Sequence, residues 1–379
     1  KITNNKTSTS LIGKIEGTGL QDKNFNENDY TYEWYRIGID GEEEKVEGQN
    51  KNTISDLNDE FDYKLVANNG KYDYMKAEGT YFYAQRKVVY VDATNGSDYN
   101  DGYTEQTAKK TMAGAYRLFD ATTSTRNKDV IVIMGTYYTI NSSVWYGDRI
   151  QEDTSFMTSR SSSTFNKNVT ITGKYQGKDY NAVLPFTGEP ELNSYSSKYL
   201  NADTTFMNLT FDGGLNQNSY SPYTTSGQLY FFLQGYNLTI GKGVKMENYA
   251  TSNTNQGLYS SKAPAFHIFG GWERYNESRL PRNNNEIKIM SGTYGRVILG
   301  GSNGISSQSA LNNSTSHNFI GASQSDKFIT KCTVDINEST TNTTKYDYDI
   351  NLLVGGGATG NTYCDCTIDI KNGTIGRML

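Results

Sequence analysis

The chain of 379 residues has few prolines, cysteines and histidines, with 5, 3 and 2 of each. Leucine and alanine, which favour long helices, are also scarce. The cysteines, Cys332, Cys364 and Cys366, are too few and too clustered for a disulfide framework. The sequence therefore disfavours both a helical protein and a scaffold built on disulfides.

Further absences limit the partners and the context. The net charge is −5, which leaves no basic stripe to neutralise phosphates, so we expect no nucleic-acid partner. No apolar run approaches the roughly 20 residues of a membrane-spanning helix, so we expect no membrane insertion within this stretch. The sequence starts at Lys1 without a signal-peptide pattern and stops at Leu379 inside a repeated pattern. We therefore expect a piece of a longer chain, truncated within its last domain and flanked by neighbouring domains.

The abundant residues are typical of strands and turns. The chain has 30 tyrosines and 37 glycines, together with many Asn, Thr and Ser residues. Its 13% of aromatic residues supplies the burial that disordered chains lack. The composition predicts an all-β protein, and its many N-x-S/T triplets favour an extracellular location.

The first part of the chain carries the pattern of a small β-sandwich. Residues 32–36 (YEWYR) predict a central strand that directs Trp34 toward the core. Residues 59–65 (DEFDYKL) match a D-x-x-x-Y-x-C corner in which Leu65 replaces the cysteine.

This pattern resembles immunoglobulin-like domains of bacterial surface proteins. The resemblance implies that Trp34 packs on Leu65 without an inter-sheet disulfide, and that Tyr63 is the tyrosine corner. We expect the domain over residues 1–86, with 1–9 as a linker or the end of a preceding module. Such modules usually act as spacers.

A different pattern begins at Lys87. Residues 88–92 (VVYVD) run into residues 95–102 (NGSDYNDG). This opening resembles that of pectate-lyase-like domains, in which such a strand and loop precede a capping helix. The resemblance implies a right-handed, single-stranded parallel β-helix over residues 87–379.

The expected capping helix spans residues 104–120. Its apolar residues recur at helical spacing: Ala108, Met112, Ala115, Tyr116 and Phe119. The open first strand of a parallel solenoid invites pairing, so we expect this amphipathic helix to cover it.

Short signatures recur through the rest of the chain. They read NVTITG at 168–173, NLTFDG at 208–213 and NLTIG at 237–241. Residues 287–296 (IKIMSGTYGR) and 368–377 (IDIKNGTIGR) also match without a gap. Such self-similarity predicts a solenoid in which each signature is one strand and its turn.

Columns of like residues are expected if these strands lie on neighbouring coils. Residues 332–336 (CTVDI) match residues 366–370 (CTIDI), so alternation directs Cys332 and Cys366 inward, stacked about 4.8 Å apart. A pair of buried thiols is favoured over a disulfide. An amide ladder beside a bend is expected from Asn168, Asn208 and Asn237.

A β-helix carries enzymes as well as adhesins, so motifs must decide the function. The histidines His267 and His317 lie outside any G-H-G motif, and the chain has no adjacent aspartate pair. The acidic series of polygalacturonase-type hydrolases is therefore missing. Arg296 and Arg377 recur at turns of the repeat, which favours a structural role over that of a lyase base.

Carboxylate pairs for a glycosidase are poorly supported. The two least unfavourable pairs are Asp203 with Asp212 and Glu273 with Glu277. For each pair the interpretation as solvated turn residues is favoured over catalysis.

The leading recognition candidate is the insertion 270–279 (GGWERYNESR), which interrupts the repeat. There Trp272 and Tyr275 can stack on a sugar, while Glu273 and Arg279 bond its hydroxyls. The alternative interpretation is a packed surface loop.

An acidic loop offers hard oxygen ligands for calcium at Asp92, Asp98 and Asp101. Its spacing differs from that of an EF-hand, because Gly102 comes one residue early after Asp98. The favoured alternative is a set of Asx-turns whose carboxylates bond the backbone. We therefore expect no cofactor, with calcium as the alternative.

These observations favour a secreted, non-catalytic, adhesin-like protein of a bacterial cell surface. Its β-helix would present loops to a glycan or to a host or extracellular-matrix protein. The alternative is a polysaccharide lyase or glycoside hydrolase of the pectate-lyase-like class. A third hypothesis, a phage-type receptor-binding spike, shares the fold and requires trimers.

Overall fold

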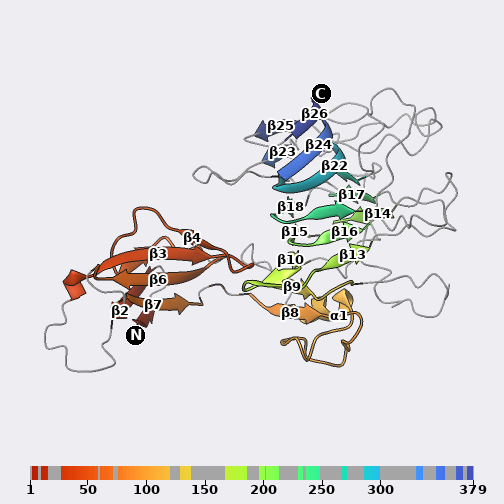
Figure 1. Cartoon of the computed structure of the whole chain (residues 1–379). Helices are drawn as coiled ribbons and strands as arrows, with labels where there is room; N and C mark the ends of the chain where they lie inside the picture. The colour runs from red at the N-terminus through yellow and green to blue at the C-terminus, as the bar shows by residue number, and fades with distance from the viewer. Residues whose placement is uncertain are drawn as a thin grey trace, which may run out of the picture. The chain divides into compact units, whose positions relative to one another are not determined.

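A computed structural model gives the fold of the chain (Figure 1). By their contacts the residues divide into two compact units. Unit 1 comprises Lys1–Lys87, Thr123–Asn127 and Lys174–Lys178, and unit 2 comprises the rest. The structure describes residues 2–6, 10–15, 27–58, 60–70, 76–82, 84, 86–119, 129–137, 167–185, 196–200, 202–212, 229–233, 236–247, 266–270, 286–298, 330–335, 347–354, 364–369 and 374–378.

Strands dominate the described residues, and helices are few. The prediction of an all-β protein is therefore confirmed. No helix within the described ranges is long and apolar enough to cross a membrane.

Unit 1 consists of two antiparallel sheets in its described residues. The first sheet has the order β1 (Ile2–Lys6), β2 (Ser10–Ile15), β5 (Thr53–Ser55). The second has the order β4 (Glu43–Lys45), β3 (Thr31–Ile37), β6 (Asp62–Asn68), β7 (Lys76–Tyr81). A short 3₁₀ turn, Glu27–Asp29, precedes β3.

The two sheets of unit 1 share one core around Trp34. Trp34 on β3 pairs in register with Leu65 on β6, and both side chains are fully buried. Leu11 and Ile54 from the other sheet belong to the same cluster. The Trp34 indole donates a 2.8 Å hydrogen bond to the carbonyl of Lys51, so its one polar atom is satisfied.

The corner predicted at Tyr63 is also present. The Tyr63 hydroxyl accepts a 2.7 Å hydrogen bond from the backbone N–H of Asn58, five residues upstream. Trp34 and Leu65 lie in one core, so the predicted packing without a disulfide is confirmed.

Unit 2 has three parallel sheets within the described ranges, here numbered 1 to 3. Sheet 1 has the order β25 (Cys364–Asp369), β23 (Thr330–Asp335), β21 (Glu286–Ile289), β18 (Leu238–Ile240), β15 (Thr204–Met207), β10 (Val169–Thr172), β9 (Asp129–Ile133), β8 (Val88–Val91). Sheet 2 has the order β13 (Val183–Pro185), β16 (Thr210–Asp212), β19 (Lys245–Glu247). Sheet 3 has the order β14 (Ser196–Tyr199), β17 (Leu229–Phe232), β20 (Phe266–Phe269), β22 (Ser291–Ile298), β24 (Asp347–Val354), β26 (Thr374–Met378). A separate ribbon pairs β11 (Lys174–Tyr175), which falls within the ranges of unit 1, with β12 (Lys178–Asp179), which crosses the boundary between the two ranges.

The chain visits the three sheets in turn. From β13 to β21 the successive strands belong to sheets 2, 3 and 1 in rotation, and later strands alternate between sheets 3 and 1. Figure 1 shows the strands of unit 2 stacked one above another from β8 to β26. We call one pass from sheet 1 back to sheet 1 a coil.

The register of sheet 1 agrees with the repeats found in the sequence. Val334 on β23 pairs with Ile287 on one side and with Ile368 on the other. The repeated segments therefore lie two coils apart. Cys332 and Cys366 are direct partners on β23 and β25, so the prediction that these strands are neighbours is confirmed.

An apolar core runs through the coils of unit 2. Five aromatic residues from the three sheets form a chain of ring contacts, with centroids 5.1 to 6.0 Å apart: Phe206, Phe211, Phe231, Phe266 and Tyr294. Each such aromatic pair adds about 0.5 to 1.5 kcal/mol beyond its burial. The stacking of coils is thus stabilised mainly from inside.

The capping helix is much shorter than the sequence predicts. Helix α1 spans only Met112–Tyr116, and Thr111 caps it by accepting a hydrogen bond from the N–H of Gly114. The expected extension over residues 104–120 is therefore wrong.

The reason for the shorter helix lies in the backbone before it. The N–H of Lys109 donates to Tyr90 and its carbonyl accepts from Asp92, so this segment pairs with the edge of β8. A segment held in that pairing cannot also be helical. The predicted burial still holds, because Ala108, Met112 and Phe119 are all buried.

Candidate functional site

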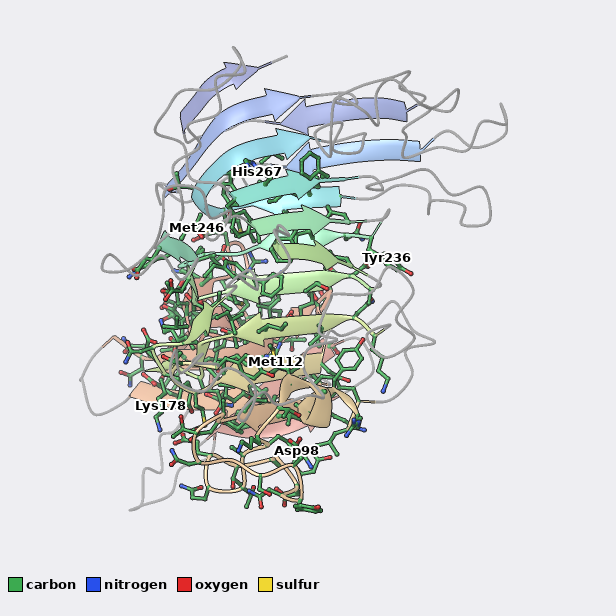
Figure 2. All side chains as sticks on the ribbon, turned by 90° about the vertical axis from the view of Figure 1, so that its right-hand side faces the viewer. Asp98, Met112, Lys178, Tyr236, Met246 and His267 are labelled. Carbon is green, nitrogen blue, oxygen red and sulfur yellow. The ribbon has the colours of Figure 1, made fainter. Side chains whose placement is uncertain are left out.

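The loop of residues 92–110, here the end loop, contains the three predicted calcium ligands. Asp98 lies at the same end of unit 2 as Met112 of α1 (Figure 2). One Asp98 carboxylate oxygen accepts from the backbone N–H groups of Lys110 and Thr111, at 3.1 and 2.9 Å. Its other oxygen accepts from the Thr111 hydroxyl at 2.7 Å. Asp98 therefore fixes the start of α1.

The other two carboxylates close turns within the same loop. Asp92 accepts from the N–H groups of Thr94 and Asn95, each at 2.9 Å. Asp101 accepts from the Tyr103 N–H at 3.1 Å and from the Thr107 hydroxyl at 2.5 Å. The Thr107 hydroxyl, followed by the Tyr103 N–H, lowers the pKa of Asp101.

The Asx-turn alternative is confirmed for Asp92 and Asp101, which accept from the N–H two residues ahead. Asp98 also bonds the backbone, but its partners Lys110 and Thr111 lie far along the chain, so it forms no Asx-turn. Across the part of the chain that the structure describes, no group of three or more His, Cys, Asp or Glu side chains converges as a metal site would require.

The end loop is also tied to a coil, since the Tyr180 hydroxyl donates to Glu105 at 2.8 Å. Burial, followed by that hydrogen bond, raises the pKa of Tyr180.

Asp203, a weak catalytic candidate, belongs to a ladder along sheet 1. The side-chain oxygen of Asn168 accepts from the N–H of Asp203 at 3.1 Å. One Asp203 oxygen accepts from the N–H of Asn237 at 2.9 Å, and the other accepts from its amide at 3.1 Å. The Asn237 side chain in turn accepts from the N–H of Glu286 at 2.7 Å. Asp203 thus links three coils and has both oxygens engaged.

The ladder corrects the predicted asparagine column. Asn168 and Asn237 belong to it, but Asp203 stands where Asn208 was expected. Asn208 follows β15 at a bend with φ +50° and precedes β16 of sheet 2. The matching sequence at 208–213 therefore leads into β16 of sheet 2, whereas the sequence at 168–173 contains β10 of sheet 1.

Asp212, the expected partner of Asp203, lies on sheet 2. There it pairs in register with Glu247 of β19. Asp203 precedes β15 of sheet 1, so the predicted pair is assigned to different sheets. Asp212 and Glu247 instead form a pair of acidic positions on neighbouring parallel strands, which the sequence analysis missed.

The leading recognition candidates Trp272, Glu273, Tyr275 and Arg279, together with Glu277, lie outside the described residues. His317 does as well. His267 lies on β20 and is 3% exposed.

The coil lengths, measured along the ladder, are 35, 34 and 49 residues. The long coil is the one that contains the insertion 270–279.

Unit 1 has a pocket on the outer face of its second sheet. The lining residues are Thr31, Glu33, Tyr35, Glu43, Lys64, Val66, Asn68 and Glu78. Lys64 forms ion pairs with Glu43 and Glu78 at 3.1 and 3.2 Å. Its one cation is shared between two carboxylates, and Glu33 pairs with Lys45 outside the lining, so the pocket has an excess of negative charge. Sequence analysis missed this pocket, since it predicted no strand at residues 43–45, where β4 lies.

No protein-family model, curated protein or solved structure matches this chain. The functional argument therefore depends on the chain's own residues.

The sequence analysis missed two exposed aromatic residues, Tyr99 and Tyr103, on the end loop. The signal that could have found them is a tyrosine set between turn-forming residues, as in DYNDGY at 98–103.

Proposed function

We propose that this chain is part of a non-catalytic, adhesin-like protein of a bacterial cell surface. In this proposal unit 1 is an immunoglobulin-like spacer. Unit 2 is a right-handed parallel β-helix that presents its loops to a glycan or to a host or extracellular-matrix protein.

The observation that carries this proposal is the use of the acidic side chains. A general acid or base must be able to approach a substrate and exchange a proton with it. Asp203, Asp98, Asp92 and Asp101 instead accept hydrogen bonds that join coils or close turns. Replacing any of these aspartates would remove hydrogen bonds that hold the scaffold together. A structural role therefore accounts for each of them without catalysis.

The organisation of unit 2 supports a presenting role. Parallel strands with a continuous core and a side-chain ladder make each coil depend on its neighbours. Insertions between strands leave such a stack intact, as the 49-residue coil illustrates. Loops of variable length on a regular scaffold are where binding residues concentrate.

The arrangement of unit 1 supports the spacer assignment. Two antiparallel sheets enclose a buried Trp34, and Tyr63 makes the corner hydrogen bond. Both features occur in immunoglobulin-like domains.

The proposal is tested by incubating the protein with acidic and neutral polysaccharides, with and without calcium. Unsaturated products are followed by ultraviolet absorbance and new reducing ends by a colorimetric assay. We expect neither, while binding to at least one glycan or matrix protein is measurable. Depolymerisation of any substrate would overturn the non-catalytic assignment. A trimeric mass in solution would favour the spike hypothesis instead.

A polysaccharide-active enzyme is the second candidate, and the pairing of Asp212 with Glu247 favours it. Two carboxylates on adjacent strands could share acid and base roles or hold calcium. If activity is found, Asp212→Asn with Glu247→Gln should abolish it. Glu60→Gln in unit 1 is the matched control and should leave activity unchanged.

A further inference from the structure

We propose that the end loop carries a saccharide-binding platform formed by Tyr99 and Tyr103. The ligand class is a neutral oligosaccharide that stacks on the tyrosine rings. This inference rests on the proposed function and assigns it a site separate from the insertion 270–279.

The first observation is exposure. Tyr99 is 102% exposed and Tyr103 is 50% exposed, whereas the aromatic residues of the unit 2 core are at or near 0%. Among the unit 2 residues whose side-chain burial the structure describes, these two are the only large apolar side chains that are exposed. Burial of such a ring would stabilise the fold. Neither exposed ring stabilises the fold in this way, and a role in binding accounts for the exposure of both.

The second observation is that the backbone under both rings is fixed. The N–H of Tyr99 donates to the Ser97 hydroxyl at 3.3 Å, and the N–H of Tyr103 donates to Asp101 at 3.1 Å. Between them, the Asn100 amide donates to the carbonyl of Ala108 at 3.0 Å. A ligand would therefore meet two rings carried on an ordered backbone, and binding would cost little ordering of the loop.

The third observation is the chemistry of the surrounding surface. Exposed residues of the same loop are Thr94, Asn95, Asp101, Thr104, Gln106 and Lys110. They supply hydroxyls, amides, one carboxylate and one ammonium group, and the whole loop has four carboxylates against two lysines, a net charge of −2. This negative charge suits a neutral ligand better than an acidic one.

A saccharide fits this surface better than a protein does. A stable protein interface covers about 800 Å² on each partner and has an apolar centre. The end loop offers two rings in polar surroundings. A sugar ring, by contrast, has one apolar face for an aromatic ring and hydroxyls at its edge for amide and hydroxyl groups.

The test is binding of the full chain to an array of neutral and acidic oligosaccharides. Tyr99→Ala with Tyr103→Ala should weaken binding to a neutral oligosaccharide by roughly tenfold or more, because both stacking contacts are lost. Phe82→Ala is the matched control, since Phe82 is a 75% exposed aromatic residue of unit 1. Its affinity should stay at the wild-type value, and the melting temperatures of all variants should agree.

A second variant reports on contact directly. Tyr99→Trp places an indole on the platform, and its fluorescence should shift to shorter wavelength as the neutral oligosaccharide is added. Unchanged affinity of the double variant, with wild-type binding present, overturns the platform and leaves the proposed function standing. Absence of wild-type binding to every neutral oligosaccharide also overturns the platform. Loss of binding to a matrix protein alone would reassign the loop to protein docking.

Discussion

Unit 1 and unit 2 are both built from strands, yet they distribute their stability differently. Unit 1 closes two antiparallel sheets around a single cluster that includes Trp34. Unit 2 extends one core from coil to coil and adds a ladder that bonds the coils from Asn168 to Glu286. In the first unit a single cluster joins both sheets, whereas in the second each core residue supports its own coil and the coils beside it.

The sharpest way to break unit 1 is Trp34→Ala. It removes a fully buried indole and the hydrogen bond to Lys51. We expect a loss of about 3 to 5 kcal/mol in the unfolding free energy of unit 1. Differential scanning calorimetry of the full chain should show one transition lowered and the other unchanged. Equal lowering of both transitions would contradict the separation of the two cores.

The corresponding change in unit 2 is Asp203→Ala. It removes both acceptors of Asn237 and leaves that amide and N–H without their partner. We expect a loss of about 2 to 3 kcal/mol, concentrated in the coils joined at Asp203. Hydrogen exchange should accelerate in β15 and β18 and stay unchanged in unit 1.

Asp203→Asn sharpens this test, because an amide oxygen can still accept from the N–H of Asn237. Its effect should be smaller than that of Asp203→Ala. Asp212→Asn on sheet 2 is the matched control and should leave exchange in β15 and β18 unchanged. Acceleration spread evenly over unit 2 would argue against local coupling between coils.

Tyr81 makes unit 1 sensitive to alkali. Its side chain is 4% exposed, and burial raises the pKa of its hydroxyl to about 12. The pKa of Tyr81 in the folded state lies above its value of about 10 in the unfolded state, so the protonated hydroxyl favours folding. This stabilisation of unit 1 is complete below pH 10 and is lost as pH rises toward 12. Unit 1 should lose about 1 to 2 kcal/mol over that interval.

Tyr81→Phe provides the control for the alkaline loss. No described residue hydrogen-bonds to the buried Tyr81 hydroxyl, so its removal should be neutral or slightly stabilising at pH 7. Denaturation followed at pH 7 and pH 11 should show a smaller difference for Tyr81→Phe than for the wild type. Equal differences would locate the alkaline sensitivity elsewhere.

The smallest expected effect is at the bend between β15 and β16. Asn208 has φ +50°, a conformation that asparagine tolerates better than alanine does. Asn208→Ala should cost about 1 kcal/mol, whereas Asn208→Gly should stay within about 0.5 kcal/mol of the wild type. Urea denaturation of the two variants measures the difference. A more stable alanine variant would contradict the assigned bend.

Local pattern predicted the features that depend on a single strand and its partner. Trp34 opposite Leu65, the Tyr63 corner and the register of Cys332 with Cys366 all follow from alternation and spacing. The Asx-turns of the end loop follow from its short acidic side chains. These features need no knowledge of which sheet a strand joins.

The failures arose where tertiary placement overrides local pattern. The helical spacing at 104–120 is real, but Lys109 pairs with the edge of β8 and restricts the helix to Met112–Tyr116. The sequence around Asn208 matches the sequence around Asn168. The strand that follows Asn208 nevertheless belongs to sheet 2, whereas the strand that follows Asn168 belongs to sheet 1. Asp203 belongs to the ladder because it lies between Asn168 and Asn237 on successive coils. The residue type alone could not indicate that position.

The central claim is that successive strands of sheet 1 stack in parallel, coil upon coil. Scalar couplings across backbone hydrogen bonds measure this directly by nuclear magnetic resonance. The account predicts couplings from the N–H of Val169 to the carbonyl of Asp203, and from the N–H of Thr204 to the carbonyl of Asn237. Couplings from these amides to the carbonyls of an antiparallel neighbour would contradict it.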